Sequence, residues 1–430
     1  MTTNLRARLT ENKHELVDSL YLFLLQGVNK FLPLLVLPYV LRVLGAEGYA
    51  YVGFSLAVVQ CAVLVIDFGF DLSATKSVAL AASDRTRLTS VFWSVVWAKT
   101  ALLLLSLFAI LIVSLSVPVF RDYWVAVCCT LPMAVGSAYT FMWLFQGIGR
   151  VRQMAVINTL SKLLLLPLIF LFVRSSSDYL LAALIQSGVF LLTALLSCWW
   201  LWRLRVVGPP VFRRRAIREE LAASWPLFLS RASTSVYTQF FVLILGFFCL
   251  KDAIGRYTAA EALMRAACFV LYVPLTQAFF PRISALSATD RPLAMRTFRN
   301  VRWMVFVAMA SISLVLFVGA PYVSRFLGAD YAGIVTLLRV MAPAPLFIGL
   351  GAVYGQMGLV ALGDERSRRQ FRNVYFFVAV AALALVAILA PLWHEMGAAF
   401  ALLLSEMLVF LLMAAAFRRR SGERKEGLCC

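Results

Sequence analysis

Apolar segments of about 20 residues recur along the chain from one end to the other. A helix of that length matches the thickness of the hydrocarbon core of a bilayer. Apolar residues make up 62% of the 430 residues and charged residues only 14%, which excludes an ordinary soluble domain. The alternating pattern of a membrane β-barrel is absent. We therefore expect an all-α polytopic membrane protein.

The segments predict twelve transmembrane helices joined by short connections. The largest predicted cytoplasmic connection is 203–218, which contains Gly208-Pro-Pro210 and lies at the midpoint of the chain. A weak echo between Leu22–Gln26 and Leu227–Arg231 also favours duplicated halves. We expect two six-helix lobes around a central cavity, residues 1–208 and 209–430. The predicted spans are 17–40, 49–75, 88–117, 122–146, 152–173, 179–202, 222–249, 254–280, 301–320, 331–361, 372–391 and 395–417.

Positive charge sets the expected orientation. Most of the 40 Lys and Arg residues fall in every second connection, and few fall in the others. Because cytoplasmic loops are enriched in Lys and Arg, this alternation predicts that both termini lie in the cytoplasm. The net charge of +19 then needs no nucleic-acid partner to explain it. The first apolar segment is predicted to be an uncleaved span, because no small-residue cleavage site follows it.

The sequence lacks the groups that most enzymes would need. It has two histidines, His14 and His394, and eight cysteines without metal-ligand spacing. No phosphate-binding loop of the Walker type is present. We expect a transporter with no cofactor, driven by a proton or another ion. Cys429 and Cys430 are expected to form an inert tail, with lipidation as the alternative.

Acidic residues gather in the stretch from Asp67 to Lys76, at the end of the second predicted span. Asp67 and Asp71 are four residues apart, which predicts that they share one face of a continuous helix. Two carboxylates on a membrane-embedded face are energetically costly unless cations pair with them. Lys76 and the cations inside other spans are the candidates.

Six cations lie inside the predicted spans away from the span ends, and each costs about 2.5–3.5 kcal/mol on an insertion scale. Only four acids, Asp67, Asp71, Glu261 and Glu406, are available to them. The excess favours a wet, positively charged cavity that receives an anion. Two alternatives stay open: Glu261 and Arg265 can neutralise each other as an i,i+4 pair, and some cations can bond to backbone carbonyls and only support the fold. The six are Lys30, Lys99, Lys162, Arg231, Arg265 and Arg339.

Prolines mark where the spans can bend. Pro33 and Pro38 interrupt the first span, and Pro226 begins the seventh. Proline removes a helical hydrogen bond and permits a kink. Kinks in corresponding spans would suit two lobes that rock against each other.

Several motifs resemble the O-antigen flippases (Wzx-type) of the polysaccharide-transport family, within the multidrug/oligosaccharidyl-lipid/polysaccharide exporter superfamily. Two departures from the family pattern occur, at Lys76, where Arg is usual, and at Gly149, where an acid is usual. The motifs are Asp67-Phe-Gly-Phe with Ser73-Ala-Thr-Lys76, Trp143-Leu-Phe-Gln-Gly147, Pro226-Leu-Phe-Leu-Ser-Arg231, Tyr257-Thr-Ala-Ala-Glu261 through Arg265, and Pro274-Leu-Thr-Gln277 leading to Pro281-Arg282.

The resemblance implies a flippase that moves undecaprenyl-diphosphate-linked repeat units from the cytoplasmic to the periplasmic leaflet of the bacterial inner membrane by alternating access. The six cations would hold the diphosphate. The gating or coupling residues would be Asp67, Asp71, Lys76, Glu261 and Gln146. The expected partners are the lipid-linked oligosaccharide, membrane lipids, a polysaccharide polymerase and a chain-length regulator.

Three rival functions remain at this point. An exporter of another lipid-linked glycan, such as capsule, common antigen or a peptidoglycan precursor, fits the same cations. A multidrug or cation antiporter would need an acid-rich cavity. A membrane-bound glycan polymerase or ligase would need a large outer loop, and every predicted outer loop is short.

Overall fold

A computed structural model describes residues 2–426. Within that range it leaves undescribed the side chains of residues 2–26, 28, 30, 230, 233–238 and 420–426. Over the described part the chain is almost entirely helical and contains no strand. This confirms the all-α class that the apolar segments predict.

The helices follow one another with short connections. Most are α-helices, η1 and η2 are 3₁₀ turns, and η3 is a π-helix. In chain order they are α1 Thr2–Asp67, α2 Phe70–Ala81, α3 Arg85–Ser116, α4 Pro118–Asp122, α5 Trp124–Thr130, α6 Pro132–Tyr139, α7 Met142–Gly147, α8 Val151–Phe172, η1 Ser176–Asp178, α9 Tyr179–Leu204, α10 Arg214–Phe248, α11 Lys251–Thr289, α12 Arg291–Leu327, η2 Ala329–Tyr331, α13 Ile334–Met341, α14 Ala344–Ala352, η3 Val353–Ala361 and α15 Glu365–Glu426.

The described helices account for all twelve predicted spans. Nine helical stretches among the described residues are long and apolar enough to cross a bilayer. Two of the nine hold a pair of spans: α1 turns at Gly45 (φ 67°), and α15 turns at Trp393 and His394. The 35-residue helix α10 supplies the remaining span. The helices therefore confirm the twelve-helix prediction.

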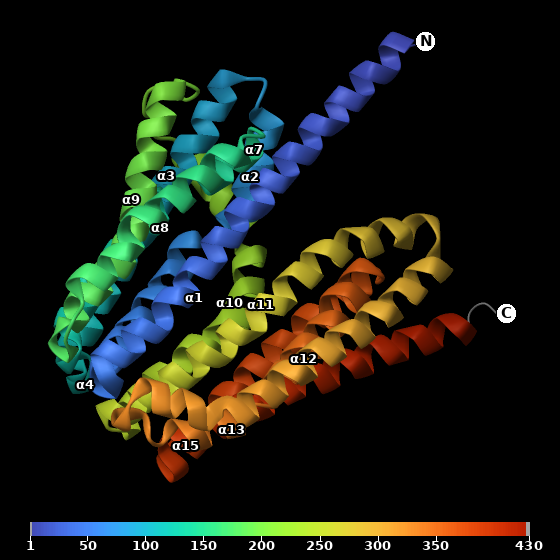
Figure 1. Cartoon of the computed structure of the whole chain (residues 1–430). Coiled ribbons are helices and arrows are strands. Elements are labelled where there is room, and N and C mark those ends of the chain that lie inside the picture. The colour runs from blue at the N-terminus through green and yellow to red at the C-terminus, as the bar shows by residue number, and fades with distance from the viewer. Residues whose placement is uncertain (1, 427–430) are drawn as a thin grey trace. The chain divides into compact units, whose positions relative to one another are not determined.

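Contacts within the chain form two compact units. The first comprises Met1–Val43 and Val58–Leu229. Its core lies where α2, α3 and α7 meet and includes Phe70, Phe92 and Trp143, each at most 3% exposed. The helices α8 and α9 of this unit run side by side (Figure 1).

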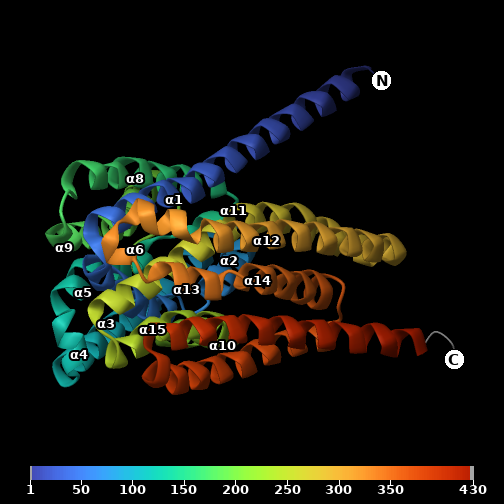
Figure 2. The same ribbon diagram turned by 60° about the horizontal axis from the view of Figure 1, so that its bottom comes forward.

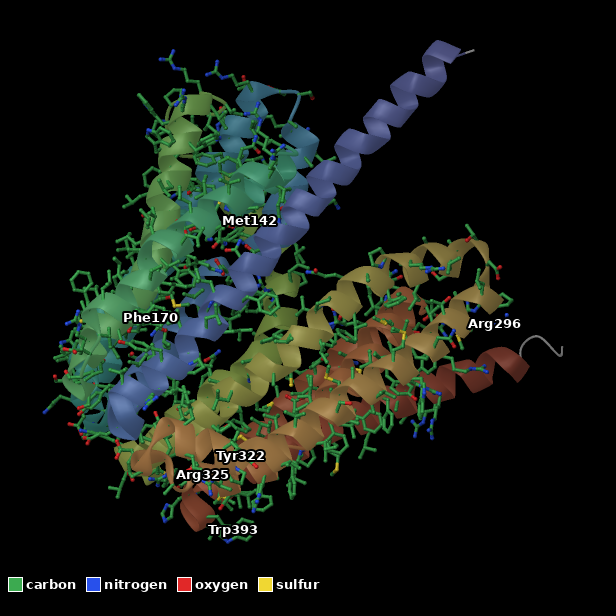
Figure 3. All side chains as sticks on the ribbon, in the orientation of Figure 1. Met142, Phe170, Arg296, Tyr322, Arg325 and Trp393 are labelled. Carbon is green, nitrogen blue, oxygen red and sulfur yellow. The ribbon has the colours of Figure 1, made fainter. Side chains whose placement is uncertain are left out.

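The second unit comprises Leu44–Ala57 and Ser230–Cys430. Its helices α11, α12, α14 and α15 lie side by side in both views (Figures 1 and 2). Their core includes Val305, Met309 and Met357, which are fully buried. Arg296 marks one end of α12, and Tyr322 with Arg325 marks the other (Figure 3).

Small residues bring the turn of α1 at Gly45 against α11 within the second unit. A Cβ on Gly255 would overlap the carbonyl oxygen of Ala46, and one on Gly53 would lie 2.5 Å from Thr258 Cγ2. Such close backbone approach between membrane helices needs small side chains. This close packing explains why residues 44–57 belong to the second unit. The predicted division into lobes 1–208 and 209–430 stays a prediction.

Replacing Gly255 by alanine should destabilise the second unit by about 1–3 kcal/mol, because the new methyl group overlaps a backbone carbonyl. Thermal unfolding of the purified protein in detergent measures this loss. Gly319, in α12, is the matched control, since a Cβ there meets no atom within 4 Å. An equal melting temperature for the two variants would contradict the packing.

Candidate functional site

The acidic stretch forms a sharp turn between α1 and α2. Phe68 and Gly69 both adopt left-handed backbone conformations, with φ of 42° and 82°. This conformation is costly for a bulky residue such as Phe68. A Cβ on Gly69 would lie 2.8 Å from Leu227 Cβ and 3.0 Å from the backbone oxygen of Ser224, so α10 crosses this turn at backbone distance.

The turn corrects one prediction. Asp67 ends α1 and Asp71 lies in the first turn of α2, so they do not share a face of one helix. The left-handed pair Phe68 and Gly69 breaks the helical periodicity between them. Spacing alone gave the wrong geometry because it assumed an unbroken helix.

Asp67 pairs with Lys99, a side chain only 2% exposed. The ammonium of Lys99, on α3, donates to Asp67 Oδ1 at 3.0 Å and to the carbonyl of Ser137 at 2.9 Å. Ser137 lies in the last turn of α6, which ends before the extended residue Thr140. Carbonyls in a last helical turn lack intrahelical donors. Lys99 therefore neutralises a carboxylate and caps a broken helix with the same group.

The start of α10 is attached to α2 by polar and aromatic contacts within the first unit. The hydroxyls of Ser73 and Ser224 are 2.6 Å apart, and Ser77 donates to Glu220 at 3.2 Å. The rings of Phe68 and Phe228 stack with centroids 4.7 Å apart. The strained conformation of Phe68 thus presents its ring flat against α10.

The other predicted gating residues of the first unit surround this turn. Asp71 is half-buried, and Lys76 is exposed. Thr75 donates to the carbonyls of Asp71 and of Trp143, which links α2 to α7. Gln146 is half-buried on α7, next to Gly147, whose Cβ would overlap α2.

Lys162 holds the first predicted span at its proline. Its ammonium donates to the backbone carbonyl of Asn29 at 3.0 Å. The side-chain amide of Asn29 donates to Thr159 Oγ1 at 2.6 Å, one turn before Lys162 on α8. Sequence reasoning missed Asn29, although its position four residues before Pro33 was the available signal. Lys30 belongs to the same span, but its side chain lies outside the described residues.

The second unit carries its charged pair on α11. Arg265 Nε donates to Glu261 Oε1 at 2.8 Å, and the Glu261 residue is 7% exposed. The expected i,i+4 pairing is confirmed. Glu406, on α15, is 5% exposed in the same unit. Arg265 and Glu261 neutralise each other, so the pair adds no net charge to α11.

The remaining two predicted cations are exposed. Arg231 lies on α10, among residues whose side chains are not described. The guanidinium of Arg339, on α13, lies 5.5 Å from the ring centre of Phe317. Phe317 is itself 50% exposed on α12, which is typical of a residue at a lipid-facing surface.

A charged network between α11 and α15 in the second unit was not predicted. Arg256 bridges Asp252 at 2.7 Å and Glu395 at 2.9 Å, which ties α11 to α15. Lys251 donates to the hydroxyl of Tyr51 at 2.7 Å. Only the folded chain brings Glu395, 139 residues away, to Arg256.

The fold and the charged groups held inside its spans define a polytopic helical membrane protein. A family model described as polysaccharide biosynthesis protein matches residues 16–287. The chain belongs to that family, and it is a transporter rather than an enzyme.

Two relatives described as "Putative O-antigen transporter" align along almost the whole chain. The one from Escherichia coli (strain K12) is 31% identical and covers 92% of this chain and 94% of its own length. The one from Shigella dysenteriae is 28% identical and covers 93% and 99%.

Solved structures share the fold at low identity. An inward-facing multidrug-resistance MATE transporter of the MOP superfamily has a TM-score of 0.71 at 15% identity, with 94% of this chain and 99% of that chain covered. The lipid II flippase MurJ in an inward closed conformation has a TM-score of 0.73 at 13% identity, with 93% and 87% covered. The family resemblance predicted from the motifs is confirmed.

Replacing Lys99 by methionine should lower the free energy of unfolding by about 3 kcal/mol, because it leaves Asp67 and the Ser137 carbonyl without their donor. The double variant D67N/K99M should lose less than the two single variants together. Unfolding in detergent measures all three. Arg215→Ala is a control, since Arg215 is 93% exposed in its pair with Glu219. If the losses of the two single variants simply add in the double variant, the pairing of Asp67 with Lys99 is contradicted.

Burial raises the pKa of Glu220, which precedes the seventh predicted span, above its ordinary value of 4.5, and the hydrogen bond from Ser77 partly offsets this rise. A carboxyl with a raised pKa adds stability when protonated and loses it as the pH rises through the folded-state pKa. The stability that Glu220 contributes should therefore fall as the pH rises from 4 to 7, and E220Q should remove this part of the pH dependence. Melting temperatures at pH 4 and pH 7 test this, with the exposed neighbour variant E219Q as control. An unchanged slope in E220Q would oppose it.

Proposed function

We propose that this protein is a flippase for lipid-linked O-antigen repeat units. It would carry an undecaprenyl-diphosphate-linked oligosaccharide from the cytoplasmic to the periplasmic leaflet of the bacterial inner membrane by alternating access. The observation that carries the proposal is the near full-length similarity to two proteins described as O-antigen transporters, at 31% and 28% identity. Both termini would lie in the cytoplasm, as the distribution of Lys and Arg predicts.

The cations inside the spans supply the chemistry that such a substrate needs. A diphosphate brings negative charge that hydrocarbon does not tolerate, and ammonium and guanidinium groups bind phosphate oxygens strongly. The polyprenyl tail can remain in lipid while the head group crosses. The proposed diphosphate ligands are Lys30, Lys162, Arg231 and Arg265.

The described contacts favour different roles for Lys99 and Arg339. Lys99 is 2% exposed, with its ammonium already on Asp67 and Ser137, so we assign it to holding the turn that follows α1. Arg339 is exposed over Phe317, so we assign it to the outer surface of the second unit. We therefore do not include Lys99 and Arg339 among the proposed substrate ligands.

Coupling would use the acid–base pairs of the two units. Asp67–Lys99 and Glu261–Arg265 are each held at hydrogen-bond distance inside a span. Protonation of either carboxylate, or its binding of another cation, would release its partner. Asp71, Lys76 and Gln146 would respond, because they lie on α2 and α7 around the turn. A polymerase and a chain-length regulator would take up the flipped units.

Removing the proposed ligands should reduce transport by more than it reduces the amount of folded protein in the membrane. In a strain that lacks its own O-antigen transporter, the triple variant K162A/R231A/R265A should reduce surface polysaccharide at least tenfold relative to the wild type. Surface polysaccharide is measured by gel staining, and membrane levels of the variant by immunoblotting. The control is the triple variant R213A/R214A/R215A, which removes as many exposed cations from the connection before α10 and its first turn.

Full surface polysaccharide in the first triple variant would contradict the proposed site. Complementation of a strain defective in another lipid-linked glycan, but not in O-antigen, would favour the first rival function. Efflux of cationic drugs by the wild type would favour the antiporter.

A further inference from the structure

Pro33 leaves one carbonyl of the first span without its helical donor. In an α-helix the carbonyl of residue 29 accepts from the N–H of residue 33, and proline has no N–H. An unsatisfied carbonyl inside hydrocarbon costs several kcal/mol, because no water reaches it. Neighbouring groups must therefore supply a donor at this depth.

Lys162 supplies that donor. Its ammonium is 3.0 Å from the carbonyl oxygen of Asn29, although the two residues are 133 positions apart and lie on α8 and α1. Thr159 accepts from the Asn29 side chain at 2.6 Å, so two contacts from one face of α8 hold α1 just before its proline. Thr159 is itself 4% exposed and anchored to the carbonyl of Ala155.

We infer that Lys162 is a positioning residue: it caps the carbonyl that Pro33 leaves open and thereby fixes the course of α1 against α8. The ring of Tyr39 packs on Phe170 of α8 with centroids 4.6 Å apart, and its hydroxyl donates to Val173 (Phe170 is labelled in Figure 3). The outer part of the span is thus held by packing and a hydrogen bond, whereas the part before Pro33 is held at Lys162.

The cap also links α1 to anion binding. An ammonium that binds phosphate oxygens has fewer donors for the Asn29 carbonyl, so an anion at Lys162 competes with the cap. Anion binding and the geometry of α1 at Pro33 are then coupled in both directions. This second part rests on the proposed function, whereas the cap itself rests only on the contacts of the first unit.

A double-mutant cycle between Pro33 and Lys162 tests the cap. K162M should lower the melting temperature by several degrees in the wild-type background. In the P33A background the loss should be less than half as large, because alanine at that position supplies an N–H to Asn29. K162R should keep most of the stability, since arginine can still donate.

K99M is the matched control, because it removes another buried lysine that caps a carbonyl, at a place unrelated to Pro33. Its effect should be equal in the two backgrounds. The inference is overturned if K162M lowers the melting temperature equally in both backgrounds. It is also overturned if P33A reduces the loss caused by K99M as much as the loss caused by K162M, because P33A would then stabilise the protein in general. If K162M alone does not fold, recovery of folded P33A/K162M supports the cap and failure of that variant overturns it.

A distance measurement tests the link to anions, with inorganic pyrophosphate as the probe. Spin labels are placed at G27C, where a Cβ meets no atom within 4 Å, and at L164C on α8, where the leucine is 53% exposed, in a cysteine-free background. Pyrophosphate and K162M should shift the distance in the same direction, and P33A should abolish the shift with pyrophosphate.

A shift with K162M but none with pyrophosphate overturns the anion link and supports the cap. No shift with either overturns the positioning role. The anion link therefore fails in the pyrophosphate arm, the cap fails in the mutant-cycle arm, and the proposed function fails separately in the surface-polysaccharide assay.

Discussion

Hydrocarbon gives no hydrogen bonds, so every break in a membrane helix must find its donors inside the protein. Two lysines meet this constraint in the first unit. Lys99 donates to Ser137 where α6 ends, and Lys162 donates to Asn29 where Pro33 removes a donor. These two lysines are unfavourable on the insertion scale, but in the folded protein they stabilise irregular backbone. This structural use of cations, which the sequence left open as an alternative, operates for both.

The turn between α1 and α2 depends on the same constraint. Gly69 adopts φ of 82° and admits the backbone of α10, and Phe68 accepts a strained conformation to stack on Phe228. Asp67, at the end of α1, is held by Lys99 from α3. One short motif therefore joins the end of α1 and the start of α2 to α10, and the ion pair with Lys99 joins it to α3. A change in the charge of Asp67 would reach all of them through direct contacts.

The sequence predicted what depends on local spacing and hydropathy. The twelve spans and the Glu261–Arg265 pair follow from periods that a helix keeps, and the structure confirms both. The helix break at Phe68 was missed, because the two acids fit an unbroken helix equally well. The partners of Lys99 and Lys162 lie 32 to 133 residues away, so only tertiary packing could identify them. For the same reason the sequence could count surplus cations but not separate structural caps from substrate ligands.

If cations inside the spans receive the diphosphate of a polyprenyl-linked glycan, the purified protein should bind the lipid diphosphate in preference to the lipid alcohol. Binding of undecaprenyl diphosphate and of undecaprenol to the purified protein, compared by native mass spectrometry, tests it most directly. The diphosphate lipid should bind at least tenfold more tightly than the alcohol, and K162A/R231A/R265A should remove the difference. Equal binding of the two lipids, or a preference that survives in the triple variant, would contradict it.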